Sequence, residues 1–516
     1  MKLVRHAFTV GGLTGVSRVS GLLRDMLLAA VLGAGPLSDA FLVAFKLPNF
    51  FRRLFAEGAF NAAFVPYFAR LHEGEGTNAA LREAEHVFMA LLLALLALVI
   101  GVELCLPWLM YVIAPGFSNS PALFEETLAL TRIMFPYILL ISLGAFYGGL
   151  LNTVGQFWAA AASPVLLNLL MIVALLAAQL SGWQGASYLA WAVLLAGAAQ
   201  MLWLMLSARR HGLAIDLVRP RLSVGVKHVL KAMGPGALGA GVMQANMLVD
   251  VALASFLGSG AISYLFYADR FSQLPLGIVG IALSTALLPL LSRHIQKGEM
   301  VAAQDAQNRA LEFALLLIMP ATLALIILAP SIIGVLFGHR KFGPHEVTAT
   351  AQVLAAFATG LPAYVCVKIF ATSFFARLDT KTPVKIALVC VVTNVVLNLL
   401  LMIPFSYVGI AMATSLSSWL NFTLLGYTLH KQGAFEVDNR LKSRFLRIMS
   451  ACACLFIVLS IWRALLPVQH TGASWGHALW LVGAITLGFV VYMAAAVWFG
   501  ALNLGELKRF KKEARA

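Results

Sequence analysis

Charged side chains gather in one largely apolar stretch of the sequence, between residues 17 and 66. They are Arg18, Arg24, Asp25, Asp39, Lys46, Arg52, Arg53 and Glu57. The hydrophobic pattern of the stretch predicts two membrane-depth helices and a short re-entrant segment. A charge near the middle of a bilayer helix costs about 2.5 to 3.5 kcal/mol on insertion scales, so such residues normally face a protein interior or a watery cavity. The stretch therefore predicts a polar cavity inside a membrane bundle.

The arginines of this stretch suit a polyanionic ligand. Arginine presents a planar fork of donors that binds phosphate oxygens in bidentate fashion, and it stays charged when partly dehydrated. Arg18 and Arg24 lie six residues apart, which is about 600° of helical rotation, so both can border one cavity. Arg270 lies well inside a later apolar segment. Three or four such arginines would suit a diphosphate head group.

Each of these charges also has a structural interpretation. Arg24 and Arg270 each neighbour an aspartate in the sequence, so either one could form a simple ion pair. Arg52 and Arg53 lie near the predicted cytoplasmic end of a span, where basic residues are ordinary. Asp39 would serve as a counter-charge for the empty cavity or as a gate latch. The sequence leaves these alternatives open.

A second polar group of residues lies farther along the chain. Asp250 falls in the middle of an apolar run, Asn394 and Asn398 lie one helical turn apart, and Thr414 follows in the next apolar segment. Oxygen ligands of this kind suit Na⁺ or a proton. Interhelical hydrogen bonds are the alternative, and the residue types do not exclude them.

The composition indicates a polytopic membrane protein. The chain has 516 residues, of which 61% are hydrophobic and 11% charged, and its mean hydropathy is +0.88. Soluble domains are about half apolar and about a quarter charged. No polar stretch is long enough for a separate soluble domain, so one helical bundle is expected to account for nearly all of the chain.

The net charge of +15 raises nucleic acid as a partner. The lysines and arginines lie mostly in short connections between apolar runs, as the positive-inside rule requires, so no nucleic acid partner is expected. The five cysteines all lie within apolar runs, without a CxxC pair or a histidine at ligand spacing. Neither disulfides nor a firm metal site are therefore predicted.

The apolar runs predict an all-α protein with about fourteen transmembrane helices. The predicted spans fall near residues 7–33, 37–55, 87–113, 127–152, 158–180, 186–208, 232–257, 262–291, 309–338, 347–376, 383–402, 405–429, 445–466 and 476–500. The first run follows basic residues like a signal peptide, but it has no convincing small-residue cleavage site and is assigned to a span.

Basic residues alternate between the predicted connections and so set an orientation. Even-numbered connections carry most of them, whereas odd-numbered ones such as 116–126 are nearly bare. The exceptions are the basic group at 339–341 and the short, uncharged connection after the fourth span. By the positive-inside rule, both termini are expected in the cytoplasm.

An internal repeat predicts the domain organisation. VLGAGPLSDAFLVAFKLP resembles FLGSGAISYLFYADRFSQLP, and MFPYILLISLGAFYGGLLNT resembles TGLPAYVCVKIFATSFFARLDT. We expect two six-helix lobes in a pseudo-twofold arrangement, as in parallel-repeat transporters. The predicted lobes are residues 1–222 and 223–435, and residues 436–516 hold the last two spans and a basic cytoplasmic tail.

Catalytic motifs are not apparent. GPGALG at 234–239 matches GxGxxG formally, but no strand precedes it and it lies in a membrane segment. No HExxH, GxSxG or Walker A motif occurs. A transporter is expected rather than an enzyme.

Several segments resemble the MurJ/MviN lipid II flippases of the multidrug/oligosaccharidyl-lipid/polysaccharide exporter superfamily. They are SRVSGLLRD, DAFLVAFKLPNFFRRLFAEGAFNAAFVP, FPYILLISL, YADRFSQLPLGIVGIALSTALLPLLS and DTKTPVKIA. The resemblance covers the whole chain. It implies that undecaprenyl-diphosphate-linked disaccharide pentapeptide moves from the cytoplasmic to the periplasmic leaflet by alternating access, for cell wall synthesis.

The resemblance also implies roles for particular residues. Those expected to bind the substrate are Arg18, Arg24, Arg52 and Arg270, and those expected at the cavity or gate are Ser17, Asp39 and Gln273. Gln273 stands where some members carry Glu, which puts in doubt any scheme that needs a carboxylate there. The second polar group resembles cation sites of the superfamily, with Asp250 as its only carboxylate.

The expected setting is the bacterial cytoplasmic (inner) membrane, with lipid II and membrane lipids as partners and the protein working as a monomer. The cell wall synthesis machinery is a further expected partner. No cofactor is expected, and coupling to Na⁺, H⁺ or the membrane potential is left open. One alternative is another exporter of the superfamily, for a drug or a polyprenyl-linked glycan. The other is a membrane-embedded polyprenyl-phosphate glycosyltransferase. Such an enzyme would need carboxylates at a membrane face, and the loops of this sequence show no such cluster.

Overall fold

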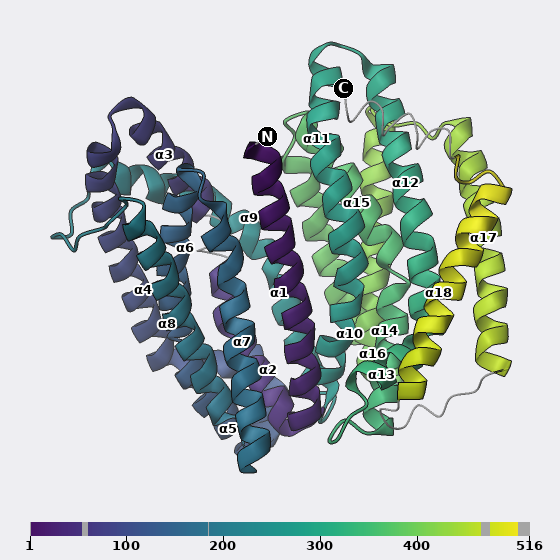
Figure 1. The fold of residues 1–516 in the computed structure, drawn as a ribbon, viewed down its shortest axis with the longest axis horizontal. Coiled ribbons are helices and arrows are strands. Elements are labelled where there is room, and N and C mark those ends of the chain that lie inside the picture. Colours follow the sequence, from purple (N-terminus) through teal and green to yellow (C-terminus); the bar gives the residue numbers. More distant parts are fainter. Residues whose placement is uncertain (1, 54–59, 184, 466–474, 504–516) are drawn as a thin grey trace. The chain divides into compact units, whose positions relative to one another are not determined.

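The computed structural model describes residues 2–53, 60–183, 185–465 and 475–503. All regular structure in these ranges is helical (Figure 1). The helices up to residue 254 are α1 (Lys2–Leu32), α2 (Pro36–Phe51), α3 (Asn61–Gly74), α4 (Thr77–Ile113), η2 (Pro115–Asn119), α5 (Pro121–Met134), α6 (Tyr137–Thr153), α7 (Phe157–Ser181), α8 (Ser187–Arg210) and α9 (Val224–Ala254). Those that follow are α10 (Ala261–Pro275), η3 (Leu276–Gly280), α11 (Ile281–Gln296), α12 (Met300–Ile327), α13 (Ala329–Phe337), α14 (Pro344–Ala358), α15 (Leu361–Ala376), α16 (Lys381–Lys431), α17 (Asn439–Leu465) and α18 (Trp475–Trp498).

The chain divides into two compact units, Met1–Ser263 and Tyr264–Ala516. The division falls within α10, some forty residues after the boundary predicted from the repeat. Compactness and sequence repetition are different properties, so the predicted lobes 1–222 and 223–435 stay a prediction. Each unit is described below by itself.

Ten helical segments of the described chain are long and apolar enough to cross a membrane. They are Thr77–Ile113, Pro121–Thr153, Phe157–Ser181, Ser187–Arg210, Ala261–Gln296, Met300–Ile327, Pro344–Ala376, Lys381–Lys431, Asn439–Leu465 and Trp475–Trp498. An all-α, multi-pass membrane protein is therefore confirmed. The count of fourteen spans stays a prediction.

The longest segment, α16, changes direction where the sequence predicts two separate spans. Ser406 interrupts it with φ 51° and ψ −133°, two residues after Pro404. A side chain at Gly409 would place its Cβ 2.1 Å from the Leu401 carbonyl oxygen, so the backbone returns past itself only because this residue is glycine.

Each unit also contains an apolar segment that is divided into two helices at a proline or a glycine. In the first unit α5 gives way to α6 at Pro136, and in the second α14 gives way to α15 beside Gly360. Helix α15 then carries Pro362 in its first turn. Proline lacks the amide donor that would continue the ladder of hydrogen bonds, which favours such breaks.

The leucine–proline pairs of the predicted repeat share a further backbone feature. After Pro48 the backbone is π-helical at residues 52, 53 and 60, and after Pro275 it is π-helical throughout η3. Single π-helical turns interrupt a helix without ending it. The repeated sequence is thus accompanied by a repeated distortion.

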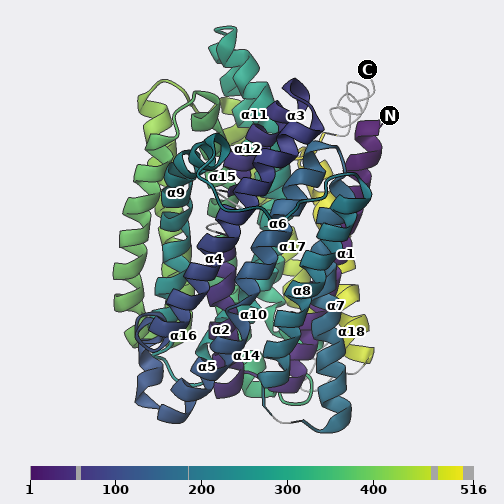
Figure 2. The same cartoon turned by 90° about the vertical axis from the view of Figure 1, so that its left-hand side faces the viewer.

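The first unit is built on long helix pairs. Helix α1 packs along α7, α6 lies against α7 and α8, and α2 lies against α5. Helix α9 packs on α3 and α4, and Figure 2 shows these three helices beside one another. The α1–α7 pairing matters for function because α1 carries the first arginines of the sequence.

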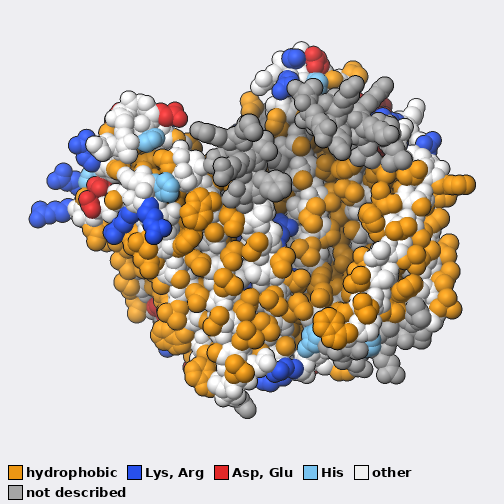
Figure 3. Space-filling view, in the orientation of Figure 1, with side chains coloured by type: hydrophobic (Ala, Val, Ile, Leu, Met, Phe, Trp, Pro, Cys, Tyr) orange, Lys and Arg blue, Asp and Glu red, His pale blue; other side chains and the backbone are white. Residues whose placement is uncertain are grey.

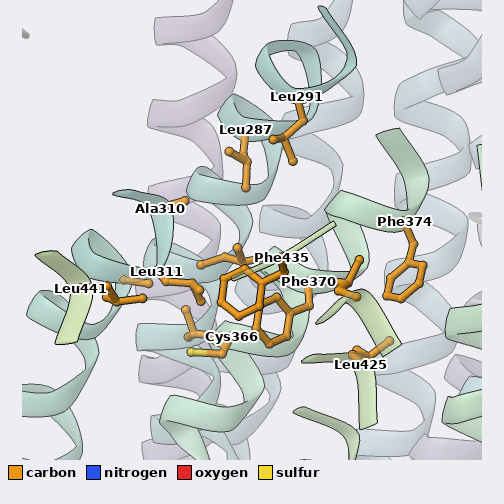
Figure 4. Packing of buried hydrophobic residues seen from close by; sticks show 14 of the residues in the cluster. Leu287, Leu291, Ala310, Leu311, Cys366, Phe370, Phe374, Leu425, Phe435 and Leu441 are labelled. Carbon is orange, nitrogen blue, oxygen red and sulfur yellow. The ribbon is translucent and has the colours of Figure 1, made fainter. Parts of the chain in front are cut away.

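The second unit has an apolar core between α11, α12, α15 and α16. Figure 4 shows Leu287 and Leu291 above Phe370 and Phe435 in this cluster. The rings of Phe370 and Phe435 lie 5.0 Å apart, centroid to centroid. The connection that follows α16 is thereby fixed to the body of the unit.

Polar contacts fasten the two C-terminal helices to α12. Glu312 of α12 forms ion pairs with Arg309, Arg440 and Arg444. The Arg444 guanidinium also donates to the carbonyl oxygen of Ala501, 2.6 Å away, just beyond α18. Helices α17 and α18 therefore belong to the same compact unit as α12 (Figure 1).

Large apolar side chains cover the outward faces of the long helices (Figure 3). Leu104 and Trp108 of α4 are 72% and 70% exposed, and Leu180 of α7 is 87% exposed. Soluble proteins rarely expose such continuous apolar surface. Lipid contact accounts for it.

Candidate functional site

Arg24 lies at the centre of a buried polar cluster in the first unit. Its Nε and Nη2 groups both donate to Asp25 Oδ1, at 3.0 and 2.7 Å, and its Nη1 donates to Asn168 Oδ1 at 3.0 Å. Arg24 is 6% exposed, Asp25 2% and Asn168 5%. Arg24 thus forms the ion pair with Asp25 that the sequence suggested, and a second helix also holds it. Its predicted part in substrate binding stays a prediction.

Asn168 of α7 connects this cluster to the α1 backbone. Its Nδ2 donates to the carbonyl oxygen of Ser17 at 2.9 Å and to Ser20 Oγ at 3.0 Å. Ser17, predicted at the cavity or gate, therefore contributes its backbone oxygen to this contact. On α2, the Phe45 ring centroid lies 6.0 Å from Arg24 Cζ, at the outer limit of a cation–π contact.

The other predicted arginines of the first unit have different surroundings. Arg18 is exposed, and Arg52 is half-buried with its Nε donating to Asn49 Oδ1 at 3.2 Å on the same helix. Their predicted part in substrate binding stays a prediction.

Asp39 of α2 accepts hydrogen bonds at the start of α10. Its Oδ2 accepts from the Gly260 amide at 2.6 Å, and its Oδ1 accepts from the Ser263 amide at 2.9 Å and from Ser263 Oγ at 2.6 Å. All three residues belong to the first unit. An N-terminal helix end favours a carboxylate, because its amides lack partners and its dipole is positive. Asp39 therefore fixes the entry into α10.

Arg270 and Gln273 lie on α10 within the second unit. The Arg270 Cζ lies 4.5 Å from the ring centroid of Phe266, a cation–π contact. Gln273 donates to Asp269 through its side-chain amide. The side chain of Gln273 thus binds the aspartate that precedes Arg270 in the sequence.

The second unit brings together three of the four residues proposed for a cation. Asn398 donates to Asn394 Oδ1 at 3.0 Å, and Asn394 donates to Thr414 Oγ1 at 3.4 Å. Thr414 in turn donates to the carbonyl oxygen of Ile410 at 3.0 Å. Asp250 is half-buried on α9 in the first unit. Among the described residues, no group of three His, Cys, Asp or Glu could hold a metal ion.

Asn168 was not among the residues predicted from the sequence. A signal for it exists in the internal repeat, because PVLLNLL at 164–170 matches NVVLNLL at 394–400. The match aligns Asn168 with Asn398 in sequence, and both side chains are buried. A lone asparagine in an apolar run gives no other indication of its partner.

Comparison with known proteins identifies the family. A family model described as "Lipid II flippase MurJ" matches residues 28–495. The chain belongs to the MurJ family. A "Probable lipid II flippase MurJ" of Rhizobium meliloti (strain 1021) is 41% identical over 519 residues, covering 99% of this chain and 97% of the relative. The expectation of a flippase family rather than an enzyme is thereby confirmed.

Solved structures agree with the MurJ assignment. A structure titled "Lipid II flippase MurJ, inward closed conformation" has a TM-score of 0.80 at 25% identity, covering 95% of this chain and 98% of the other. A multidrug resistance MATE family transporter of the MOP superfamily, in an inward-facing conformation, has a TM-score of 0.66 at 15% identity, covering 83% of this chain and 99% of the other. The latter likeness shows a shared fold alone.

Proposed function

We propose that this protein moves lipid II, the undecaprenyl-diphosphate-linked peptidoglycan precursor, from the cytoplasmic to the periplasmic leaflet. The nearly full-length match to the MurJ family carries this proposal. The buried Arg24 supports it, because a buried arginine held by hydrogen bonds is suited to phosphate oxygens. Transport of this substrate supplies cell wall synthesis.

Four arginines are the proposed ligands of the diphosphate. They are Arg18, Arg24 and Arg52 of the first unit and Arg270 of the second. Arg24 is the strongest of them, since burial makes its charge expensive to keep and its partners hold it in one orientation. Arg270 has its charge placed over an aromatic ring, which stabilises a cation without neutralising it.

Asp39 is the proposed latch of an alternating-access cycle. Its carboxylate accepts three hydrogen bonds from the start of α10. Moving α10 away would expose both the carboxylate and the two backbone amides to new partners. This contact therefore stabilises the conformation described here relative to one in which α2 and α10 are apart.

The proposed topology has fourteen spans and two six-helix lobes, with both termini in the cytoplasm. Taking α16 as two spans separated at Ser406, and adding α1, α2 and α9 to the apolar segments, gives that count. The alternation of basic connections supports the orientation. Coupling to a cation at Asn394, Asn398 and Thr414, with Asp250, is part of the proposal, as is the membrane potential, worth about 2.3 kcal/mol per charge per 100 mV.

Leaflet-specific labelling of lipid II tests this function. Cells depleted of the protein should accumulate lipid II in the inner leaflet, and the wild-type protein should restore the outer-leaflet signal. The Arg24→Ala variant should fail to restore it at equal membrane abundance. An unchanged leaflet distribution after depletion would reject the proposed function.

A further inference from the structure

We propose that Asn168 is a positioning residue that holds the Arg24 guanidinium in the orientation that binds the substrate diphosphate. This inference rests on the proposed function. It assigns a role in substrate binding to a residue on α7, a helix that contributes none of the four proposed ligands.

The hydrogen bonds around Arg24 define the orientation. A guanidinium has five N–H donors. Asp25 takes two of them and Asn168 takes one. Within the described chain, one N–H on Nη1 and one on Nη2 therefore lie outside these hydrogen bonds. These two N–H groups, one on each terminal nitrogen, can donate to phosphate oxygens.

Asp25 binds the guanidinium from the same helix, since it directly follows Arg24 on α1. Asn168 approaches from α7 and binds the opposite terminal nitrogen, Nη1. Contacts from two helices therefore hold the plane of the guanidinium.

The orientation of the Asn168 amide is itself determined by its other partners. Its nitrogen donates to the Ser17 carbonyl oxygen, which can only accept a hydrogen bond. A flipped amide would place an oxygen against that carbonyl and its NH₂ group against the arginine. Consequently the side-chain oxygen of Asn168 must face Arg24.

An asparagine also suits the charge requirement of this position. Asp25 already supplies one negative charge to the cluster. A second carboxylate at position 168 would give the cluster a net negative charge and repel a diphosphate. The amide provides an acceptor for Arg24 without that charge.

The matching asparagines of the two repeat copies have different hydrogen-bond partners. At the matching position of the second half, Asn398 donates to Asn394. The same buried amide thus serves as an acceptor for Arg24 in one copy and as a donor to an amide in the other.

Lipid II affinity in a double-mutant cycle tests the inference. Purified wild type, Asn168→Ala, Arg24→Lys and the double variant would be titrated with lipid II in lipid nanodiscs. We expect Asn168→Ala to weaken binding about tenfold, as loss of a hydrogen bond to a charged group can. In the Arg24→Lys background, which lacks the planar fork, Asn168→Ala should change affinity by less than about twofold.

Gln200→Ala is the matched control. Gln200 is a buried amide on α8 that accepts from Tyr137 at 3.3 Å and donates to the Ser163 carbonyl oxygen on α7 at 2.9 Å. It makes the same kind of interhelical contact away from Arg24. We expect its loss to lower thermal stability as much as Asn168→Ala does and to leave lipid II affinity unchanged.

The inference is overturned if Asn168→Ala weakens binding equally in both backgrounds, or only as much as Gln200→Ala does. An unchanged affinity of Asn168→Ala in folded protein overturns it too. These outcomes leave the proposed function standing, provided that Arg24→Lys weakens binding. If Arg24→Lys binds lipid II as wild type does, the diphosphate assignment of Arg24 fails instead.

Discussion

The two units each bury an asparagine in a long helix, and the partners of the two side chains differ. In the first unit Asn168 accepts from Arg24, which is ion-paired to Asp25. In the second, Asn398 donates to Asn394, which donates to Thr414. Under the proposed function, the first arrangement would direct donors at the diphosphate, and the second would supply oxygen atoms to a cation.

The proposed function thus assigns two kinds of ligand to one repeated framework. Both asparagines are buried, so the proposed difference in ligand depends on a few neighbouring side chains. Because a buried charge is costly in a membrane protein, each such side chain needs a partner that the framework supplies. The predictions below change one of these side chains at a time.

Replacing Arg24 should have the largest effect. Arg24→Ala removes the donor fork and leaves the Asp25 carboxylate without the guanidinium that it binds, so we expect lipid II transport to be abolished. Leaflet-specific labelling in depleted cells measures this, with protein abundance checked by immunoblot. Arg53→Ala is the control. Arg53 is exposed, and we expect this variant to transport lipid II as wild type does. Normal transport by Arg24→Ala would contradict the proposed role of the first unit in binding the diphosphate.

Replacing each of the two asparagines by aspartate should change the binding of a different ligand. We expect Asn168→Asp to weaken lipid II binding about 10- to 100-fold, because it adds negative charge beside Arg24. Asn398→Asp should leave that affinity within about twofold, and the added carboxylate should strengthen Na⁺ binding.

Lipid II titration and thermal unfolding with and without Na⁺ measure these two responses. A rise in melting temperature caused by Na⁺ should be larger for Asn398→Asp than for wild type. Equal losses of lipid II affinity in both variants would show that the two copies are not specialised.

Asp39→Asn should have an intermediate effect. The amide retains one acceptor oxygen and loses the charge that holds three donors at the start of α10. We expect a loss of about 1 to 3 kcal/mol in the stability of the described conformation. Thermal unfolding measures it, and Ser38→Ala, which removes a single hydroxyl contact to Ser263, should cost less. A variant as stable as wild type would contradict the role of Asp39 as a latch.

The smallest effect is expected at the start of α16, the helix that carries Asn394 and Asn398. Hydrogen bonds from Thr382 and Lys381 lower the pKa of Asp379 below its ordinary value of 3.8. A depressed folded-state pKa means that the carboxylate stabilises the protein above about pH 4 and that this contribution is lost as the pH falls through the folded-state pKa.

Asp379→Asn should therefore cost at most about 1 kcal/mol at pH 7, because this carboxylate is solvent-accessible. The difference from wild type should shrink as the pH is lowered to 3. Unfolding curves at both pH values measure it, and a difference that does not depend on pH would contradict the assigned cause.

Much of the architecture followed from the sequence. The apolar runs predicted a multi-pass helical membrane protein because burial in lipid requires about 20 apolar residues for each span. The change of direction in α16 near Pro404 also agrees with the separate spans predicted at 383–402 and 405–429. The end of the first unit was not predictable, because compactness depends on packing between helices and the repeat gave a different boundary.

The candidate site was predicted only in part. Arg24 was identified because an arginine in an apolar helix is conspicuous, and its neighbour Asp25 was visible as an ion-pair partner. Asn168 lies 144 residues away in sequence and is an unremarkable residue type. The Asp39 contact with Gly260 was likewise hidden, since its donor is a backbone amide that every residue other than proline possesses.

The amino-acid sequence was sufficient to predict the class of protein, the resemblance to the MurJ family and the charged residues that require a partner. These properties follow from composition, periodicity and local residue type, which are written along the chain. The partner of Arg24 on another helix depends on the fold, because Arg24 and Asn168 meet through the packing of α1 on α7. A hydrogen bond requires two groups within about 3 Å, and only folding brings groups from distant helices to that distance.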